Sequence, residues 1–494
     1  MKKLNDNSVA IVGSGIAGLA VAIRLAVKGF TVNVFEANAY PGGKLSVFEN
    51  NGYRFDAGPS LFTMPQLVEE LLLLAGKNPI TCFPYIKLEK GCHYFYEDGT
   101  KLIAYQDSQK FANEIESKLG VDPNKVLKYL EKAKYRYEIT APLFLEKSLH
   151  KLGNFLRKET IKGIISIPKL NLFEPMNDEN EKVLQHPHLV QYFNRFATYN
   201  GSNPYQAPAL LNMIPHLEHG IGTFFPKNGM HQITETLYET ALELGVTFHF
   251  NHKVDLVQTE KTNVSGVWAN EKFYPSKLVV SNMDIHPTYR KLLKNHVAPE
   301  HLLKQEKSSS ALIFYWGIDK EFQQLDLHNI FFASDYKAEF KAIFEERRLY
   351  EDPTVYINIS CKYKRDDAPK GCENWFVMIN TPNNNGQDWE KWKAIAKNQI
   401  LEKLSRILGD DIGKYIVTED TLDPISIETK TSSLGGSLYG NASNNRYAAF
   451  LRHANFHSKI KGLYFCGGSV HPGGGIPLCL QSAKIVSELI PSIV

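Results

Sequence analysis

Cysteine, net charge and long apolar runs are all scarce in this sequence of 494 residues. The six cysteines show no C-x-x-C spacing, which argues against a zinc site and a disulfide framework and suits a reducing, cytoplasmic setting. A net charge of +3 is too small to indicate binding to nucleic acid. No Ser/His/Asp grouping and no metal-ligand pattern is found, so no metal is expected. With 43% hydrophobic residues, the chain is predicted to be globular, with two or three lobes.

The apolar stretch Val9 to Ile23 follows Lys2 and Lys3 and superficially resembles a secretory signal. It is shorter than the roughly 20 apolar residues that a transmembrane helix needs. Three glycines interrupt it, and Arg24 and Lys28 follow at once. We therefore expect this stretch to belong to the folded protein, and no other segment is long and apolar enough to cross a bilayer.

A glycine motif lies between two strand-like runs near the N-terminus. Ser8 to Val12 and Thr31 to Phe35 are short apolar runs, and Ala17 to Lys28 has a helical pattern. Between the first run and the helix, glycines occur at G-x-G-x-x-G spacing, at Gly13, Gly15 and Gly18. This order of strand, glycine loop, helix and strand is typical of a βαβ dinucleotide-binding unit.

Each position of this motif has a physical role in such a unit. Gly13 permits the tight turn, Gly15 lets the backbone approach a pyrophosphate, and Gly18 lets the helix pack closely against the strand. The start of the helix offers free N–H groups to phosphate. Glu36 follows the second strand, where a carboxylate accepts hydrogen bonds from an adenosine ribose. The predicted cofactor contacts here are Gly13, Ser14, Gly15, Ile16, Ala17, Gly18, Glu36 and Ala37.

The next segments distinguish FAD from NAD. Pro41-Gly42-Gly43-Lys44 and the run Gly52 to Ser60 (GYRFDAGPS) resemble the continuation found in the amine oxidase-like flavoproteins. In that superfamily the paired glycines and the basic residue lie along the FAD diphosphate and ribityl chain. Lys44 stands where many members have arginine, which keeps the charge and loses the bidentate fork. The resemblance implies FAD contacts at Gly42, Gly43, Lys44, Gly58, Pro59 and Ser60.

A second glycine-rich segment, CGGSVHPGGGIPLCLQSAK, occurs near the C-terminus. The run Leu463 to Cys466 is strand-like, and a helical pattern covers Leu478 to Ile490. The N–H groups at the start of that helix can face the N1/C2 edge of a flavin, which gains negative charge on reduction. The predicted contacts in this loop are Gly468, Ser469, Gly474, Gly475, Ile476 and Pro477.

This segment resembles the THPGAGIP-type signature of carotenoid desaturases of the phytoene desaturase family. Ser469 replaces the usual threonine, and Gly474 replaces alanine. Asn228 is a further departure, because the family often has glycine there, which puts the geometry of that loop in doubt. The resemblance covers nearly the whole chain, through Arg195 to Ala209, Phe224 to Met230, Leu278 to Asp284, Ile330 to Tyr336, Asp367 to Pro369 and Ser433 to Gly440.

The resemblance implies an FAD-dependent carotenoid desaturase. Asp56 to Pro65 is most similar to the 1-hydroxycarotenoid 3,4-desaturases, of the methoxyneurosporene dehydrogenase type. A phytoene desaturase or a lycopene-forming desaturase is the first alternative. A carotenoid isomerase, a polyene saturase or an amine oxidase would use the same cofactor for another reaction. A lipid-binding module without flavin is also considered, but the complete glycine motif argues against it.

The predicted fold is α/β, with a Rossmann-like FAD-binding domain and an α+β substrate domain that contains an antiparallel sheet. The FAD-binding domain is expected to be discontinuous, because strand-like runs that return to it are far apart in sequence. By resemblance, Val254 supplies a backbone contact to the adenine. The predicted boundaries are 1–80, 220–300 and 440–494 for the FAD-binding domain, 85–130 and 300–440 for the substrate domain, and 130–190 for a helical lid that contacts the membrane.

A basic amphipathic pattern covers residues 144–172. Aliphatic and aromatic residues recur at helical spacing, and only Glu146 and Glu159 oppose the cations Lys147, Lys151, Arg157, Lys158, Lys162 and Lys169. Such a helix can lie in the membrane interface with its lysines toward anionic lipid. A solvated lid helix has the same pattern. A carotenoid substrate resides in lipid, so the resemblance favours a peripheral association with the membrane.

Catalytic residues are not evident from the sequence. A general base would be an Asp, Glu, His or Tyr near the flavin. His471 is the nearest such residue in sequence to the flavin motif, although we expect a structural role for it. Arg195 and Tyr199 occur in a family segment and are candidates for lining the substrate channel.

Overall fold

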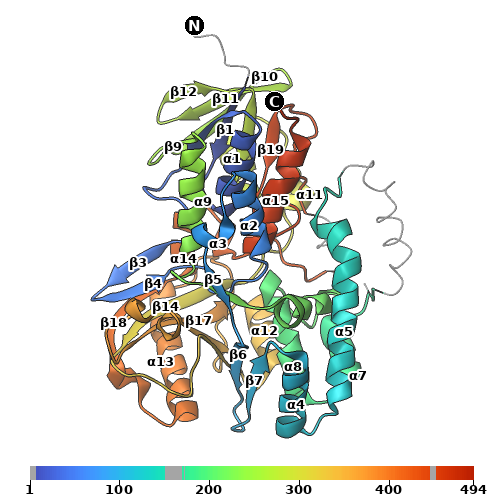
Figure 1. Cartoon of the computed structure of the whole chain (residues 1–494), viewed down its shortest axis with the longest axis vertical. Helices are drawn as coiled ribbons and strands as arrows, with labels where there is room; N and C mark the ends of the chain where they lie inside the picture. Colours follow the sequence, from blue (N-terminus) through green and yellow to red (C-terminus); the bar gives the residue numbers. More distant parts are fainter. Residues whose placement is uncertain (1–6, 151–169, 172, 446–451, 494) are drawn as a thin grey trace.

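The computed structural model describes residues 7–150, 170–171, 173–445 and 452–493. Within this part of the chain, a five-stranded sheet lies in the upper half of the molecule and a seven-stranded sheet in the lower half (Figure 1). The α/β fold with several sheets agrees with the prediction.

The five-stranded sheet has the order β19-β13-β1-β2-β9, and all its neighbouring strands are parallel. Parallel neighbours need long crossover connections, so the strands come from distant parts of the chain. The first two predicted strands have the observed bounds, and the strand that begins at Leu463 ends one residue earlier than predicted. The bounds are β1 (Ser8–Val12), β2 (Thr31–Phe35), β9 (Thr247–His249), β13 (Leu278–Ser281) and β19 (Leu463–Phe465).

Both faces of this sheet are covered, as parallel sheets require. Val9 and Ile11 of β1 pack in one core with four helices, α1 (Ile16–Val27), α2 (Gln66–Leu74), α9 (Gln232–Glu243) and α15 (Ile476–Leu489). Ala10 and Val12 belong to the core on the opposite face. That core includes an antiparallel sheet of β10 (Val254–Glu260), β11 (Asn263–Ala269) and β12 (Lys272–Pro275).

The seven-stranded sheet has the order β18-β14-β17-β16-β15-β6-β7. The sheet predicted to be antiparallel is mixed: its neighbouring strands are antiparallel except β15 and β6, which pair in parallel. These two strands come from distant parts of the chain, so no tight turn sets their relative direction. The bounds are β6 (Lys90–Phe95), β7 (Lys101–Tyr105), β14 (Ser310–Ile318), β15 (His328–Phe331), β16 (Val355–Ile359), β17 (Glu373–Thr381) and β18 (Ile416–Leu422).

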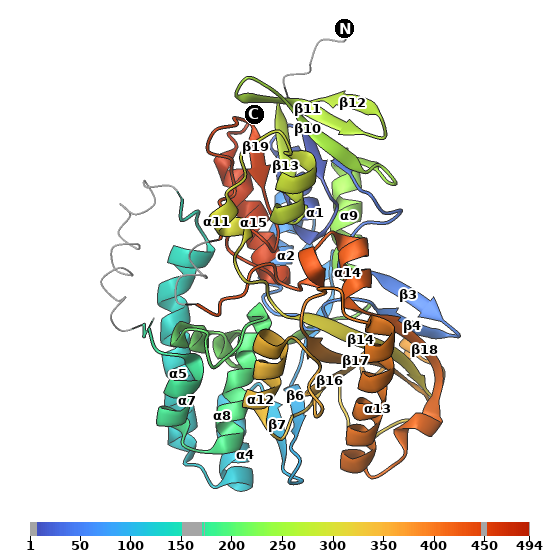
Figure 2. The same ribbon diagram turned by 180° about the vertical axis from the view of Figure 1, so that it is seen from behind.

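Strand β14, which lies between β18 and β17, is buried along its whole length. One side of the sheet carries α13 (Trp389–Leu408), and a group of helices lies on the other side of the lower half (Figure 2). These helices share a core with β6 and β7. They are α4 (Ser108–Leu119), α5 (Pro123–Thr140), α7 (Met176–Leu184) and α8 (Pro187–Asn194), followed by the short turns η4 (Arg195–Asn200), η5 (Ala209–Met213) and η6 (Leu217–Ile221).

Short strands connect the two halves. The hairpin β3–β4 packs against the lower sheet, where β4 contacts β17, and β5 pairs with β8 in a separate ladder. The bounds are β3 (Val47–Asn50), β4 (Tyr53–Asp56), β5 (Tyr85–Lys87) and β8 (Phe224–Pro226).

The described helices include none that is both long and apolar enough to cross a bilayer. Most of the basic segment 144–172 lies outside the described residues, including Lys151, Arg157, Lys158, Lys162 and Lys169. The membrane-facing lid therefore stays a prediction.

Candidate active site

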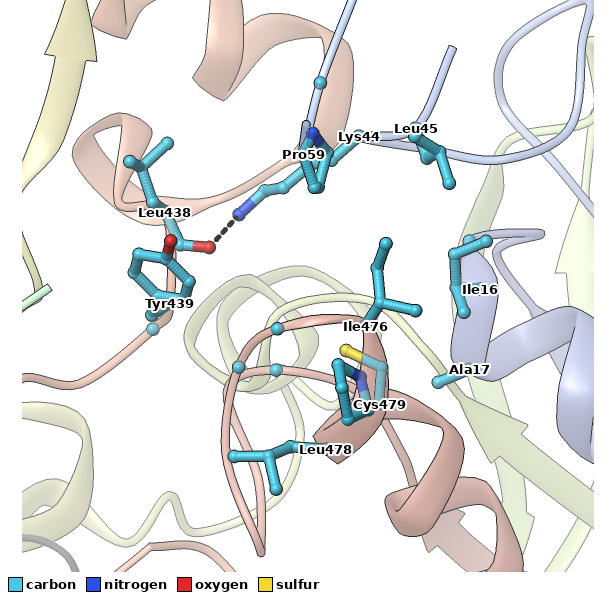
Figure 3. A pocket seen from close by; sticks show the side chains of 18 of the residues that line it. Ile16, Ala17, Lys44, Leu45, Pro59, Leu438, Tyr439, Ile476, Leu478 and Cys479 are labelled. Atoms are coloured by element: carbon cyan, nitrogen blue, oxygen red, sulfur yellow. Dashed lines mark hydrogen bonds between the residues drawn. The ribbon is translucent and has the colours of Figure 1, made fainter. Parts of the chain in front are cut away.

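A single cavity of about 1430 Å³ is lined by residues from both halves of the molecule. Figure 3 shows one part of it, where side chains from the glycine loops, from α1 and from the start of α15 point toward a common space. The predicted cofactor residues that line the cavity are Gly13, Gly15, Ile16, Ala17, Glu36, Ala37, Gly42, Gly43, Lys44, Gly58, Pro59, Ser60, Val254, Gly468, Ser469, Gly474, Gly475, Ile476 and Pro477. Ser14 and Gly18 do not line it.

The loop before α1 forms an anion cradle. Gly13 has φ +92°, which favours glycine, and Gly15 is the N-cap of α1. No side chain caps this helix and its first turn has no acidic residue. Its first N–H groups and the positive end of its dipole are therefore available to phosphate. Gly43 lies close to Gly15, because a Cβ added to Gly43 would sit 3.3 Å from the Cα of Gly15.

Gly18 and Ser14 do not line the cavity but support the cradle through packing and hydrogen bonds. A Cβ at Gly18 would lie 2.2 Å from the carbonyl oxygen of Gly13, so only glycine lets the helix and the loop pack this closely. The N–H and hydroxyl of Ser14 donate to Glu36 Oε2 at 2.8 and 2.9 Å. Asn38 donates to Glu36 Oε1 through its N–H and its amide group. Glu36 is thereby held at the end of β2, with its carboxylate at the cavity.

The C-terminal glycine loop packs against the segment 433–440. A Cβ at Gly474, where related sequences have alanine, would lie 2.8 Å from the Cα of Tyr439. The hydroxyl of Ser469 accepts a hydrogen bond from the N–H of Ile285 at 2.9 Å, so the serine retains the role of a hydroxyl residue. No side chain caps α15, and Pro477 stands in its first turn. A second uncapped helix start therefore faces the same cavity as α1.

The loop at Asn228 is closed by hydrogen bonds of its own residues and of Asp56. The N–H of Asn228 donates to Gln232 Oε1 at 3.1 Å, and Gly229 is the residue with positive φ, at +86°. Asp56 accepts from the N–H groups of Met230 and His231 at 2.8 and 2.9 Å. Two motifs that are distant in sequence thus close one turn at the start of α9.

Lys44 is a cation inside the cavity. Its Nζ donates to the carbonyl oxygens of Ser437 and Leu438 at 2.9 and 2.8 Å, and the second bond is drawn in Figure 3. Burial lowers the pKa of Lys44 to about 8, although the nearby Asp284 carboxylate opposes this shift.

A buried ion pair stands elsewhere on the cavity wall. Arg195 donates to both oxygens of Glu218 at 2.9 and 3.0 Å, and the hydroxyl of Tyr199 donates to the same carboxylate. All three side chains line the cavity. Burial opposes ionisation of Glu218, but the Arg195 charge and the Tyr199 hydrogen bond outweigh it and lower the pKa of Glu218. The sequence singled out Arg195 and Tyr199 and missed Glu218, which no motif marks.

His471 does not line the cavity. It is 1% exposed, and its Nε2 lies 2.8 Å from the carbonyl oxygen of Lys147. Burial lowers the pKa of His471 to about 4, so the ring is neutral at pH 7. The side chain of Lys147 forms an ion pair with Glu488 at 3.0 Å. His471 and Lys147 thus fasten the start of the basic segment to the C-terminal part of the chain.

The geometry agrees with comparisons to known proteins. The sequence profile of the flavin containing amine oxidoreductase family matches residues 16–491. The chain belongs to this family. FAD is therefore its cofactor, and the chain is an oxidoreductase. The site fits FAD, because two uncapped helix starts, the glycine cradle and Glu36 all meet in one cavity. When it binds, the residues that would hold it are those of the cradle, Lys44 and the C-terminal glycine loop.

The relatives place the chain among the carotenoid-modifying members of the family, as the sequence motifs indicated. It is 54% identical to a 1-hydroxycarotenoid 3,4-desaturase of Flavobacterium sp. (strain P99-3), over 98% of both chains. It is 32% identical to a 4,4'-diapolycopene oxygenase of Methylomonas sp, also over 98% of both chains. A solved structure of putrescine oxidase with bound putrescine has the same fold, with a TM-score of 0.64 at 14% identity over 98% of each chain.

The pKa of Lys44 predicts that FAD binding depends on pH. The protonated amine attracts the FAD diphosphate, and in the flavin-free protein it loses its proton above about pH 8. We expect the Kd for FAD to rise above that pH, by up to about tenfold per pH unit for one proton. Titration of flavin-free protein between pH 7 and 10 measures this. Lys44→Arg should remove the dependence, and the same pH profile in Lys44→Met would contradict the assignment.

Proposed function

We propose that this chain is an FAD-dependent carotenoid desaturase that introduces the C3–C4 double bond of a 1-hydroxycarotenoid. The observation that carries the proposal is the 54% identity to 1-hydroxycarotenoid 3,4-desaturase over 98% of both chains. A cavity that extends from the FAD cradle to the seven-stranded sheet supports it, because an enzyme of this kind must hold a cofactor and a long substrate together. Its volume also exceeds that of an ordinary pocket for one small ligand.

The walls of the cavity beyond the cradle suit a polyene. Strands β14 and β17 contribute Ile313, Phe376 and Met378, and the helical segment around η5 contributes Leu211 and Ile214. Apolar side chains from these elements exclude water and can align an extended chain without polar contacts along its length.

FAD supplies the hydride acceptor when bound, and the second hydrogen leaves the substrate as a proton. The positive charge that develops spreads along the polyene, so placement in an apolar channel is the main requirement. Arg195 stays protonated because the Glu218 charge outweighs the cost of burial and raises the pKa of its guanidinium. Tyr199 already donates its hydroxyl to Glu218. Neither side chain is placed to accept the substrate proton, and His471 lies outside the cavity.

Product analysis tests the reaction. Flavin-loaded protein, mixed with a 1-hydroxycarotenoid in liposomes, should yield a product that has lost two hydrogens and gained one conjugated double bond. Phytoene serves as the competing substrate for the alternative desaturases. A product of unchanged mass would indicate an isomerase, and a product that has gained two hydrogens would indicate a saturase. A product that has gained oxygen would indicate an oxygenase, the activity named for the relative from Methylomonas sp. Any of these outcomes would contradict the proposal.

We further propose that the enzyme collects its substrate from the cytoplasmic leaflet of the membrane through residues 144–172. The support is the position of the cavity wall next to this segment. Tyr137, Thr140 and Ala141 line the cavity, and so do residues 144–147, which lead directly into the basic stretch. A carotenoid has negligible free concentration in water, so an opening near lipid shortens its transfer.

Replacing Lys151, Arg157, Lys158 and Lys162 with glutamine should weaken binding to anionic liposomes sharply at low salt. Each such cation near an anionic surface contributes about 1 kcal/mol, and the attraction fades within a Debye length. FAD content should stay unchanged. Co-sedimentation at low and high salt measures the effect, and replacement of Lys118, Lys125, Lys128 and Lys134 on α4 and α5 provides a control of equal charge. Equal binding by the basic-segment variant and wild type at low salt would show that the segment is only a lid.

A further inference from the structure

A group of polar side chains interrupts the apolar wall of the cavity. Strand pairing places His328 of β15 opposite Asn358 of β16, and Ile330 opposite Tyr356. Paired residues share a face of the sheet, so His328, Ile330, Tyr356 and Asn358 point to the same side. His328, Ile330 and Tyr356 line the cavity.

The hydrogen bonds of this group determine the tautomer of His328. The amide nitrogen of Asn358 donates to the carbonyl oxygen of Leu327 at 3.1 Å, which fixes the orientation of that amide. The same nitrogen lies 3.2 Å from His328 Nδ1, so Nδ1 is an acceptor. Tyr356 also directs its hydroxyl at Nδ1, at 2.7 Å. Burial lowers the pKa of His328 to about 4, and a neutral ring with an accepting Nδ1 carries its proton on Nε2.

The Nε2–H of His328 is an unused donor. His328 is 2% exposed, and this nitrogen is buried without a hydrogen-bond partner among the described residues. Buried donors in folded proteins are nearly always paired, so an unpaired one in a binding cavity indicates a polar group of the ligand.

Glu218 offers the complementary acceptor on the same cavity. Its carboxylate is ionised, and its charge acts on His328. Arg195 and Tyr199 donate to it, and a carboxylate has enough lone pairs to accept one further hydrogen bond. A hydroxyl group both accepts and donates, and it therefore matches this pair of protein groups.

We propose that His328 and Glu218 bind the C1 hydroxyl of the substrate and so select hydroxylated end groups. His328 Nε2–H donates to the hydroxyl oxygen, and Glu218 accepts the hydroxyl proton. This inference rests on the proposed function, since it assumes a 1-hydroxycarotenoid substrate.

The location suits the bond that reacts. The hydroxyl carbon C1 is only two bonds from C3, so the hydroxyl site must lie beside the cofactor end of the cavity. A hydrogen-bonded chain makes this connection. The hydroxyl of Tyr356 is 2.7 Å from that of Ser60, which belongs to the glycine-containing loop at the cofactor end, and it is bonded to His328 on its other side.

The test compares three carotenoids with one polyene and different groups at C1, namely hydroxyl, methoxyl and hydrogen. The methoxyl group keeps the acceptor oxygen for His328 but has no proton for Glu218. Flavin-loaded wild type should convert them with kcat/KM decreasing in that order, with at least about a tenfold advantage of hydroxyl over hydrogen. The Kd of each carotenoid, measured by the change in its absorption spectrum, should follow the same order.

In His328→Leu the carotenoid with methoxyl at C1 should no longer have a higher kcat/KM than the one with hydrogen, because the donor is gone. His328→Gln keeps an N–H donor and should restore part of this difference in kcat/KM. His453→Leu is a matched control, since His453 is also buried but bonded through both ring nitrogens, and it does not line the cavity. It should keep the wild-type order. FAD content and melting temperature report on folding in every variant.

The outcomes separate the two proposals. Wild-type selectivity in His328→Leu, or equal conversion and binding of all three carotenoids by wild type, would overturn the hydroxyl site and leave the desaturase function standing. Failure of wild type to convert any of them would overturn the proposed function, and the Kd series would still decide whether the cavity selects a hydroxyl group.

Discussion

Gly15→Val is expected to give a folded protein that retains no FAD. The backbone of Gly15 has φ −64° and ψ 172°, which valine adopts easily. An added Cβ would lie 2.8 Å from Oδ1 of Asn282, the end of a side chain that can move. The two methyl groups would then occupy the cradle at the start of α1, where the diphosphate must approach the backbone.

The ratio of flavin to protein absorbance after gel filtration measures this loss, and circular dichroism checks the fold. Ala26→Val is a suitable control, because it adds two methyl groups to the same helix at a position that does not line the cavity. It should retain full flavin. A fully yellow Gly15→Val protein would contradict the placement of FAD in the cradle.

Arg195→Met is expected to lower the free energy of unfolding by about 3–5 kcal/mol. The substitution leaves the buried Glu218 carboxylate without its counter-charge, and among the described residues the Tyr199 hydroxyl is then the donor that still bonds it. Since a buried pair costs desolvation as well as gaining attraction, Arg195→Met/Glu218→Leu should recover most of the loss. Urea unfolding of both variants measures the difference. Equal stability of the single and double variants would show that the pair is not coupled.

The loss of unfolding free energy in Arg195→Met should depend on pH. In the wild type the pKa of Glu218 is lowered, so the carboxylate stabilises the fold above the ordinary glutamate pKa, and this contribution is lost as pH falls through the folded value. Without Arg195, burial raises the pKa instead, and protonation at low pH relieves the variant. The gap between wild type and Arg195→Met should therefore narrow as pH falls from 7. A gap that widens would contradict the ionised state of Glu218.

The sequence by itself predicted the elements whose requirements are local. The strands β1 and β2 have the predicted bounds, and α1 begins one residue before the predicted start. Here the turn at Gly13, the close packing at Gly18 and the carboxylate at Glu36 all act within one βαβ unit. The motifs also predicted the family, because a cofactor needs the same backbone shapes in every member.

Other features depended on which distant segments meet. Glu218 pairs with Arg195, and Lys44 reaches the carbonyl oxygen of Leu438 across nearly the whole sequence. Motif proximity named His471 as a weak candidate for a base while a structural role was expected, and the structure shows that it does not line the cavity and that its Nε2 contacts the backbone of Lys147. Position in the sequence does not determine the direction in which a side chain points once the loop is packed.

The proposed hydroxyl site around His328 shows most clearly which features the sequence predicts and which depend on the tertiary structure. His328 lies two residues before a segment that matches the family and Tyr356 lies outside every such segment, so neither was named as a site residue, whereas Ser60 stands in a cofactor motif. Pairing of β15 with β16 puts His328 and Tyr356 on one face, and packing of the cofactor domain on the sheet brings Ser60 to them. The backbone conformation of a glycine motif is set by steric limits within a few residues. The polarity of a cavity is set by strand register and domain contact, which only the tertiary structure decides.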